Sequence, residues 1–416
     1  MQKVNPFLEK TKSIEKSYES LKKLAPAPYD KDSTSPFTKV RVILMNGTEF
    51  EANWFSHHFS RHCNDNDLRR EIALIRRREQ QQQKKIASLK PIEETVLQHT
   101  MGYEQLAVEL TAILAKHVKD KDVKKALDFA LLEDFDHVFR FANLLEMDEG
   151  IKAEKLLGYY TEIMPGRPTI AEHRYPADEI KRYINSDKAD LFTKLTVNII
   201  TAAEQQTMNF YMNQANFYPN DLGRRLYSEI AMIEEQHVSQ YGSLIDTNCT
   251  LLECLVMHEY TECYLYYSCA LDESNERIKD MWREFYLEEC AHLQKANSLM
   301  QKYENKSYED LFKGGAEFPE PLVFGENKEY VRKILKETGD YTAKLEGYEK
   351  VSLLDKNAPF FTYNKKVVTP ESQTPSHQVI EKHIKCCGSD YRYEDKQNPI
   401  PSLRSRKEDN ITFGRE

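Results

Sequence analysis

Three histidines in the chain each follow an acidic residue by three positions: Asp134 with His137, Glu234 with His237, and Glu289 with His292. A glutamate stands thirty residues before each of these acids: Glu104, Glu204 and Glu259. Residues three apart share one face of an α-helix, so an acid and a histidine at this spacing can reach the same ion. An acid before a histidine is common by chance, but one offset that recurs three times is not. The pattern therefore indicates metal binding.

The offset of thirty residues fits a helical hairpin, in which a residue of the first helix lies level with a residue of the second. Each hairpin then supplies a glutamate together with an acid-x-x-His pair. Two hairpins supply carboxylates and imidazoles for a pair of metal ions in the core of a four-helix bundle. Carboxylates with imidazoles suit iron or manganese better than a metal that prefers thiolates. The sequence thus predicts a dinuclear iron or manganese site.

Long helices must position these residues, and apolar residues recur at three- and four-residue steps throughout this part of the chain. We expect helices near 92–118, 121–148, 188–217, 221–245, 249–271 and 274–302. Short joins favour antiparallel hairpins, whereas the segment 149–187 is long enough to cross a whole bundle. The hairpin of Glu104 should therefore pair with the hairpin of Glu204. The hairpin of Glu259 should stand beside them or pair with its copy in a homodimer.

The regions on either side of the helices have a different character. Residues 37–55 alternate around Asn46-Gly47, which is the strongest short signal for a β-hairpin, and a charged helix is expected over 66–90. Residues 327–350 can hold one more helix, and the polar tail from 357 is expected to be irregular.

The expected fold class is all-α, a four-helix bundle with an additional helical hairpin. A small N-terminal α/β extension and an irregular C-terminal tail flank it. The corresponding segments are an N-terminal extension over 1–91, a helical domain over 92–305 and a mixed C-terminal extension over 306–416.

Composition excludes several classes of function. Acidic residues outnumber basic ones by 67 to 58, which argues against nucleic acid as the main partner and suits a protein that collects cations. No run of about 18 apolar residues suggests a membrane span. The polar start of the chain lacks the apolar core of a signal peptide, so a cytoplasmic location is expected. The eight cysteines contain no CxxC pair, and most resemble buried thiols rather than a disulfide framework.

Several segments resemble the rubrerythrin branch of the ferritin-like superfamily: EQQTMNFYMNQA over 204–215, YSEIAMIEEQHV over 227–238 and EYTECY over 259–264. The resemblance extends over 92–302 and implies that the expected four-helix bundle is ferritin-like. It implies bridging or terminal carboxylates at Glu104, Glu204 and Glu259, and further metal ligands at Asp134, His137, Glu234, His237, Glu289 and His292. Members of the superfamily reduce peroxide, activate oxygen, dismutate peroxide with manganese or store iron.

The chain departs from that pattern in three ways. Asp134 stands where glutamate is usual, and there are three half-sites where one bundle needs two. The rubredoxin-like module is absent, so electrons would come from an external donor. The leading interpretation is a dinuclear oxidoreductase that acts on peroxide or oxygen. Metal storage or sequestration, and a structural or adaptor bundle with a degenerate site, are the alternatives.

Overall fold

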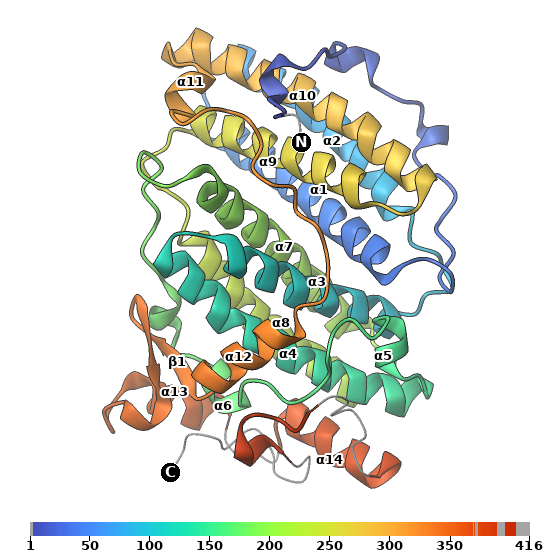
Figure 1. The fold of residues 1–416 in the computed structure, drawn as a ribbon, viewed down its shortest axis with the longest axis vertical. Helices are drawn as coiled ribbons and strands as arrows, with labels where there is room; N and C mark the ends of the chain where they lie inside the picture. The colour runs from blue at the N-terminus through green and yellow to red at the C-terminus, as the bar shows by residue number, and fades with distance from the viewer. Residues whose placement is uncertain (1–2, 369, 371–372, 389–395, 405–416) are drawn as a thin grey trace. The chain divides into compact units, whose positions relative to one another are not determined.

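The computed structural model describes residues 3–368, 370, 373–388 and 396–404. Nearly all regular structure in these ranges is helical, which confirms the expected class (Figure 1). The strands within them are β1 (Tyr341–Lys344) and β2 (Gly347–Lys350), an antiparallel pair with Tyr341 opposite Lys350. Among the described helices, none is both long enough and apolar enough to cross a bilayer.

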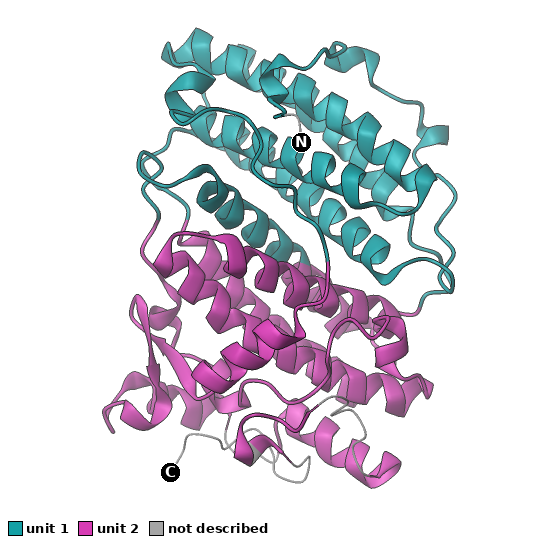
Figure 2. Cartoon of the chain, viewed as in Figure 1, with its two compact units in different colours: residues 1–94, 184–206, 245–324 teal, residues 95–183, 207–244, 325–416 magenta. Residues whose placement is uncertain are grey.

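The chain forms two compact units, each assembled from three separate stretches of sequence (Figure 2). Unit 1 contains residues 1–94, 184–206 and 245–324. Unit 2 contains residues 95–183, 207–244 and 325–416. The units therefore do not follow the segments 1–91, 92–305 and 306–416 expected from the sequence. The N-terminal region instead belongs with the hairpin of Glu259.

Four long helices of unit 1 pack side by side (Figure 1): α1 (Pro36–His62), α2 (Asn66–Ala87), α9 (Leu251–Asp272) and α10 (Glu276–Glu304). α1 packs against α2 and α9, and α10 packs against α9 and α2. Trp282, Phe285 and Ile72 are fully buried in this unit. The hairpin of Glu259 is thus covered by an N-terminal hairpin of the same chain, a partner that the sequence pattern did not predict.

The β-hairpin expected over residues 37–55 is wrong, because this segment lies inside helix α1. Asn46-Gly47 occupies the middle of the helix rather than a turn. A Cβ atom at Gly47 would lie 2.8 Å from Cβ of Gln206 and 3.6 Å from the carbonyl oxygen of Ala202. Both belong to α7 (Leu191–Phe217), so Gly47 serves the close approach of two helices.

Gly47→Val is expected to lower the free energy of unfolding by about 1–3 kcal/mol, because the added methyl groups must displace α7 or strain the packing. Thermal or urea unfolding of the full chain measures this loss. Gly150→Val is unsuitable as a control because Gly150 has a positive φ of 67°. Gly242→Val is suitable, since a Cβ there would meet no atom within 4 Å. Equal stability of the Gly47→Val variant and the wild type would contradict the close contact.

Unit 2 is built on α3 (Val96–His117), α4 (Lys121–Glu149), α8 (Asp221–Gly242) and residues 207–217 of α7. α3 packs against α4, and α4 packs against α8, as the expected pairing of their two hairpins requires of these helices (Figure 1). The helices predicted near 92–118, 121–148 and 221–245 are confirmed within a few residues at their ends.

The C-terminal region of unit 2 is more ordered than the sequence indicated. α12 (Lys328–Thr338) packs against α4, as one more helix in 327–350 predicted. The tail expected to be irregular instead contains α13 (Pro359–Val367) and α14 (Pro375–Cys387), and α14 packs against α4 and α8.

Short helical elements complete the described chain. They are α5 (Ala153–Leu156), α6 (Thr169–Glu172), α11 (Tyr308–Leu311), and the 3-10 turns Pro6–Leu8, Ile14–Lys16, Leu21–Lys23, Pro176–Glu179, Val351–Leu353 and Pro401–Leu403.

Candidate metal centres

Four helical hairpins of the described chain share one internal spacing: α1–α2, α3–α4, α7–α8 and α9–α10. The second helix of each begins after a capping side chain that accepts backbone N–H groups: Asp65, Asp120, Asn220 or Asn275. A glutamate stands sixteen residues before every cap, and an acid stands fourteen residues after it. At 1.5 Å per residue, the glutamate and the acid both lie about 20 Å from the turn. The common spacing therefore predicts that the two carboxylates of a hairpin lie at about the same level.

The unit 2 centre consists of Glu104 on α3, Asp134 and His137 on α4, and Glu234 and His237 on α8, all fully buried. Ligand atoms of Glu104, His137 and Glu234 lie within 4.8 Å of one another. Those of Asp134, Glu234 and His237 do so as well. Glu234 thus belongs to both triads, and each triad has its own histidine.

The two oxygens of Glu234 face different histidines. Nδ1 of His137 lies 3.0 Å from Oε1, and Nδ1 of His237 lies 3.1 Å from Oε2. Asp134 Oδ1 is 3.3 Å from the same nitrogen of His237. Nε2 of His137 makes no hydrogen bond within the described chain. Burial, followed by the nearby Arg140, holds the pKa of His137 well below its usual range, so the ring is neutral, as a metal ligand must be.

Glu204 is buried on α7, in the stretch 184–206 that belongs to unit 1. Seven residues later the same helix carries Tyr211, which belongs to unit 2 and lies on the same helical face. The Tyr211 hydroxyl donates a hydrogen bond of 2.5 Å to Glu104 Oε1. The place of Glu204 opposite Glu234 stays a prediction of the common spacing.

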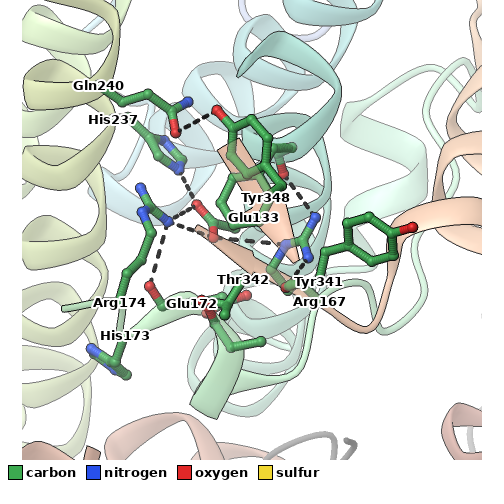
Figure 3. A network of polar contacts seen from close by, with 12 residues as sticks. Glu133, Arg167, Glu172, His173, Arg174, His237, Gln240, Tyr341, Thr342 and Tyr348 are labelled. Carbon is green, nitrogen blue, oxygen red and sulfur yellow. Dashed lines mark hydrogen bonds and ion pairs between the residues drawn. The ribbon is translucent and has the colours of Figure 1, made fainter. Parts of the chain in front are cut away.

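Nε2 of His237, the ring nitrogen that faces away from Glu234, belongs to a buried ion-pair network (Figure 3). Nε2 of His237 lies 2.5 Å from Oε2 of Glu133, and Nη1 of Arg174 lies 2.6 Å from both oxygens of that carboxylate. Burial opposes ionisation of Glu133, but Arg174, His237 and Arg167 outweigh it and lower its pKa. An ionised Glu133 can only accept, so Nε2 is the donor. Nδ1 of His237 then keeps its lone pair towards Asp134 and Glu234.

The arginines of this network come from the crossover segment, and Arg167 is held by backbone carbonyl groups of α4, α12 and β1 (Figure 3). Arg167 donates to the carbonyl oxygens of Tyr341 at 2.5 Å, Thr338 at 3.0 Å and Phe129 at 3.1 Å. Tyr348 of β2 donates to Gln240, one turn after His237, over 3.1 Å. Sequence reasoning missed these residues because their contacts join positions far apart in the chain, with no common spacing to identify them.

Glu133→Gln is expected to weaken metal binding at the unit 2 centre by about 10–100-fold, since it removes the carboxylate that fixes the tautomer of His237. Competition between the protein and a coloured chelator for Mn²⁺ or Fe²⁺ measures the change. The matched control is Glu337→Gln, which alters an exposed glutamate of α12 in the same unit. An unchanged affinity in the Glu133→Gln variant would show that His237 needs no such partner.

The unit 1 centre consists of Glu49, Glu79, Glu259, Glu262, Glu289 and His292, all buried. The predicted ligands Glu259, Glu289 and His292 are therefore together, but in a different unit from the predicted ligands of the Glu104 hairpin. Nδ1 of His292 lies 2.8 Å from Glu289 Oε2 and 3.8 Å from Glu259 Oε2. Ligand atoms of Glu79, Glu259 and His292 lie within 4.8 Å of one another. Those of Glu259, Glu262 and Glu289 form a second such group.

The electrostatics of the unit 1 centre are unfavourable in the protein alone. Burial, together with neighbouring carboxylates, raises the pKa of Glu79 to about 8 and raises the pKa values of Glu259 and Glu262 well above their usual range. Burial lowers the pKa of His292, but Glu289 outweighs it and the net shift is upward. Both oxygens of Glu79, Glu259 and Glu262 lack a hydrogen bond within the described chain. Buried carboxylates in this state are costly unless a cation compensates them.

Sequence reasoning missed Glu49, Glu79 and Glu262, although the signal was present. Glu49 stands thirty residues before Glu79, the same offset as in the other hairpins. Gln82 stands three residues after Glu79, where the other hairpins have histidine, and a search for acid-x-x-His pairs passes over it. Equivalent residues of α1–α2 and α3–α4 are 55 positions apart, as are those of α7–α8 and α9–α10. The chain therefore contains a recurring hairpin pattern.

Histidines also cluster near the end of α1, where they lie on the surface. His57, His58 and His62 are exposed near the end of α1, and Cys63 follows them at its C-cap. This fits a surface cluster.

Comparison with protein-family models, with curated proteins and with solved structures finds no match to this chain.

Proposed function

We propose that the chain is a dinuclear iron or manganese oxidoreductase that acts on peroxide or oxygen, on a ferritin-like helical scaffold. The observation that carries the proposal is the position of Glu234. One carboxylate is shared by two buried triads and directs one oxygen towards each of two histidines. A carboxylate in this position can bridge two ions, each of which has its own imidazole and at least one further carboxylate.

The donor set fits such a pair. Carboxylate oxygens and imidazole nitrogens suit iron and manganese, and no thiolate is among the ligand groups found around the centre. Nδ1 of His137 lies 3.0 Å from Glu234 Oε1, so an ion shared with this carboxylate would have that nitrogen as a ligand. Glu133 orients His237 in the way that carboxylates orient metal-bound histidines generally.

An iron or manganese pair, when bound, supplies reversible electron transfer at the centre. The residues of the chain hold and bridge the ions and fix the orientation of the histidines. Burial of all five ligands keeps bulk water away from the reacting oxidant. Reduction of hydrogen peroxide to two water molecules consumes two electrons and two protons. The sequence has no CxxC pair of the rubredoxin type, so these electrons would come from an external donor.

The resemblance of residues 204–215 and 227–238 to rubrerythrins supports the same assignment. In those segments the chain combines an early glutamate, a tyrosine two turns later, and a Glu-x-x-His pair on the following helix. Tyr211 and His237 are both buried and belong to unit 2. The tyrosine hydrogen-bonds a carboxylate of the centre, Glu104, and so helps to position that ligand.

The test is consumption of hydrogen peroxide and of oxygen by the full chain loaded with Fe²⁺ or Mn²⁺, followed with electrodes. Without a reductant, we expect uptake to stop at a few equivalents per chain. With an added reductant, we expect repeated turnover that Glu234→Ala abolishes. Uptake of hundreds of equivalents of iron without turnover would instead identify a storage protein. No metal-dependent uptake at all would leave a structural bundle.

A further inference from the structure

Unit 1 contains a second group of buried ligand residues that the proposed reaction does not use. Glu79, Glu259 and His292 form one triad, and Glu259, Glu262 and Glu289 form another, with Glu259 common to both. We propose that the unit 1 centre binds two divalent cations at unequal positions bridged by Glu259, one with an imidazole ligand and one with oxygen ligands alone.

Uncompensated burial is the first reason for this assignment. Five carboxylates gather in the core of the four-helix unit: Glu49, Glu79, Glu259, Glu262 and Glu289. Arg78 of α2 is committed to Glu288, which its Nη2 contacts at 2.7 Å. The imidazole of His292 lies against Glu289 and Glu259, and the imidazole of His258 lies near Glu262. Two imidazoles cannot balance so many carboxylates, whereas two divalent cations can.

The inequality of the two positions follows from Gln82. The common hairpin spacing puts glutamine here, at the place that His137 occupies in unit 2. The Gln82 amide donates to Glu289 Oε1 at 2.5 Å and to Glu288 Oε2 at 3.3 Å. The position formed by Glu259, Glu262 and Glu289 therefore has no nitrogen ligand in its triad. Oxygen-only sites favour hard cations such as Mn²⁺ or Mg²⁺.

A cavity of unit 1 reaches a residue that lies next to this position. Its volume is about 790 Å³, and His258 of α9 forms part of its wall. Nε2 of His258 makes no hydrogen bond within the described chain and lies 3.7 Å from Glu262 Oε1, and the ring stacks on Phe55 with 5.4 Å between centroids. One buried side chain, 8% exposed, thus contacts both the cavity and a carboxylate of the oxygen-only position.

The experiment uses Mn²⁺ as the probe and the full chain with Glu234→Ala as the background. Metal that the wild type binds and the Glu234→Ala background does not bind belongs to the unit 2 centre. Metal that the background still binds belongs to the unit 1 centre. Failure of this proposal and failure of the proposed function are therefore distinguishable. Equilibrium dialysis gives the stoichiometry, and electron paramagnetic resonance distinguishes a bridged Mn²⁺ pair from isolated ions by its exchange coupling.

The background protein should retain about two Mn²⁺ ions with a coupled signal. Glu262→Gln, which keeps the side-chain volume, should reduce this to about one uncoupled ion, and His292→Ala should do the same at the other position. The Gln82→His variant should keep both ions and bind the ion at the oxygen-only position more tightly. A folding defect would weaken binding, so it could not produce this result. Glu284→Gln, on the exposed side of α10, should change nothing.

Two results would overturn the proposal. One is a background protein that retains no Mn²⁺ although circular dichroism shows it to be folded. The other is a stoichiometry and signal that stay the same in Glu262→Gln and in His292→Ala. Two ions without exchange coupling would also overturn it, because Glu259 would then not bridge them.

Discussion

Glu234→Ala is expected to remove both metal ions of the unit 2 centre together, rather than one of the two. The reason is geometric: Glu234 belongs to both ligand triads, so its loss opens both positions. It also leaves His137 and His237 without the carboxylate that each contacts at about 3 Å. Titration of the metal-free protein with Fe²⁺ or Mn²⁺ should show the capacity falling by about two ions per chain, with loss of peroxide turnover.

The matched control for this variant is Glu235→Ala. Glu235 is the next residue of α8, is only partly buried, and accepts a hydrogen bond from Ser239 at 3.0 Å. It should keep full capacity, and thermal unfolding should show that both variants are folded. Loss of a single ion in Glu234→Ala would mean that this carboxylate is a terminal ligand of one ion, and the shared position would then carry no bridge.

The combined substitution Glu79→Gln, Glu259→Gln and Glu262→Gln is expected to stabilise the metal-free protein while it removes stabilisation by metal. Each carboxylate is buried and has a raised pKa, and neither of its oxygens has a hydrogen bond within the part of the chain that the structure describes. Neutral amides of the same size remove the cost of burying these acids together. The gain should be on the order of 1–3 kcal/mol in the free energy of unfolding.

The order of stability should reverse when metal is present. The wild type should gain about 2.7 kcal/mol when free metal is at 100 times the dissociation constant, whereas the combined variant should gain much less at the unit 1 centre. Urea unfolding with and without a chelator measures both arms. If the metal-free variant were less stable than the metal-free wild type, the carboxylates would be structural groups satisfied within the fold.

Local spacing allowed much of the fold to be predicted from the sequence. Apolar periodicity located α3, α4, α7, α8, α9 and α10, because each has apolar residues at three- and four-residue steps over many turns and is bounded by turn residues. The thirty-residue offset led to Glu104 and its partner Asp134, because hairpin geometry converts a fixed offset into proximity. Glu104 does lie with His137 and Glu234 in one buried group. The long segment 149–187 indicated which hairpins pair, and α4 does pack against α8.

The errors have physical causes that a single sequence conceals. Asn46-Gly47 has the composition of a turn, but its glycine is required by the approach of α7, a contact made 159 positions away at Gln206. Because α1 was not predicted, no partner for the Glu259 hairpin was apparent in the sequence. The fourth hairpin has Gln82 where the others have histidine, so a search for acid-x-x-His pairs did not find it. The order of α13 and α14 comes from tertiary contacts, which override a polar composition.

The outer part of the unit 2 centre was also beyond prediction from spacing. Glu133 precedes a predicted ligand by one residue, and nothing local distinguishes it from a solvent-facing acid. Its role depends on Arg174 and Arg167, which lie in the crossover. Those arginines are in turn held by contacts that include the carbonyl oxygen of Tyr341 in β1. A site ligand thus depends on three regions that the sequence suggested were separate.

The most direct test of the central claim is anomalous diffraction from crystals of the full chain, recorded at the iron and manganese absorption edges. The account predicts two peaks on either side of the Glu234 carboxylate, about 3.5–4 Å apart, one beside His137 and one beside His237. Crystals grown with either metal that show no peak within reach of Glu234 would contradict a dinuclear centre in unit 2.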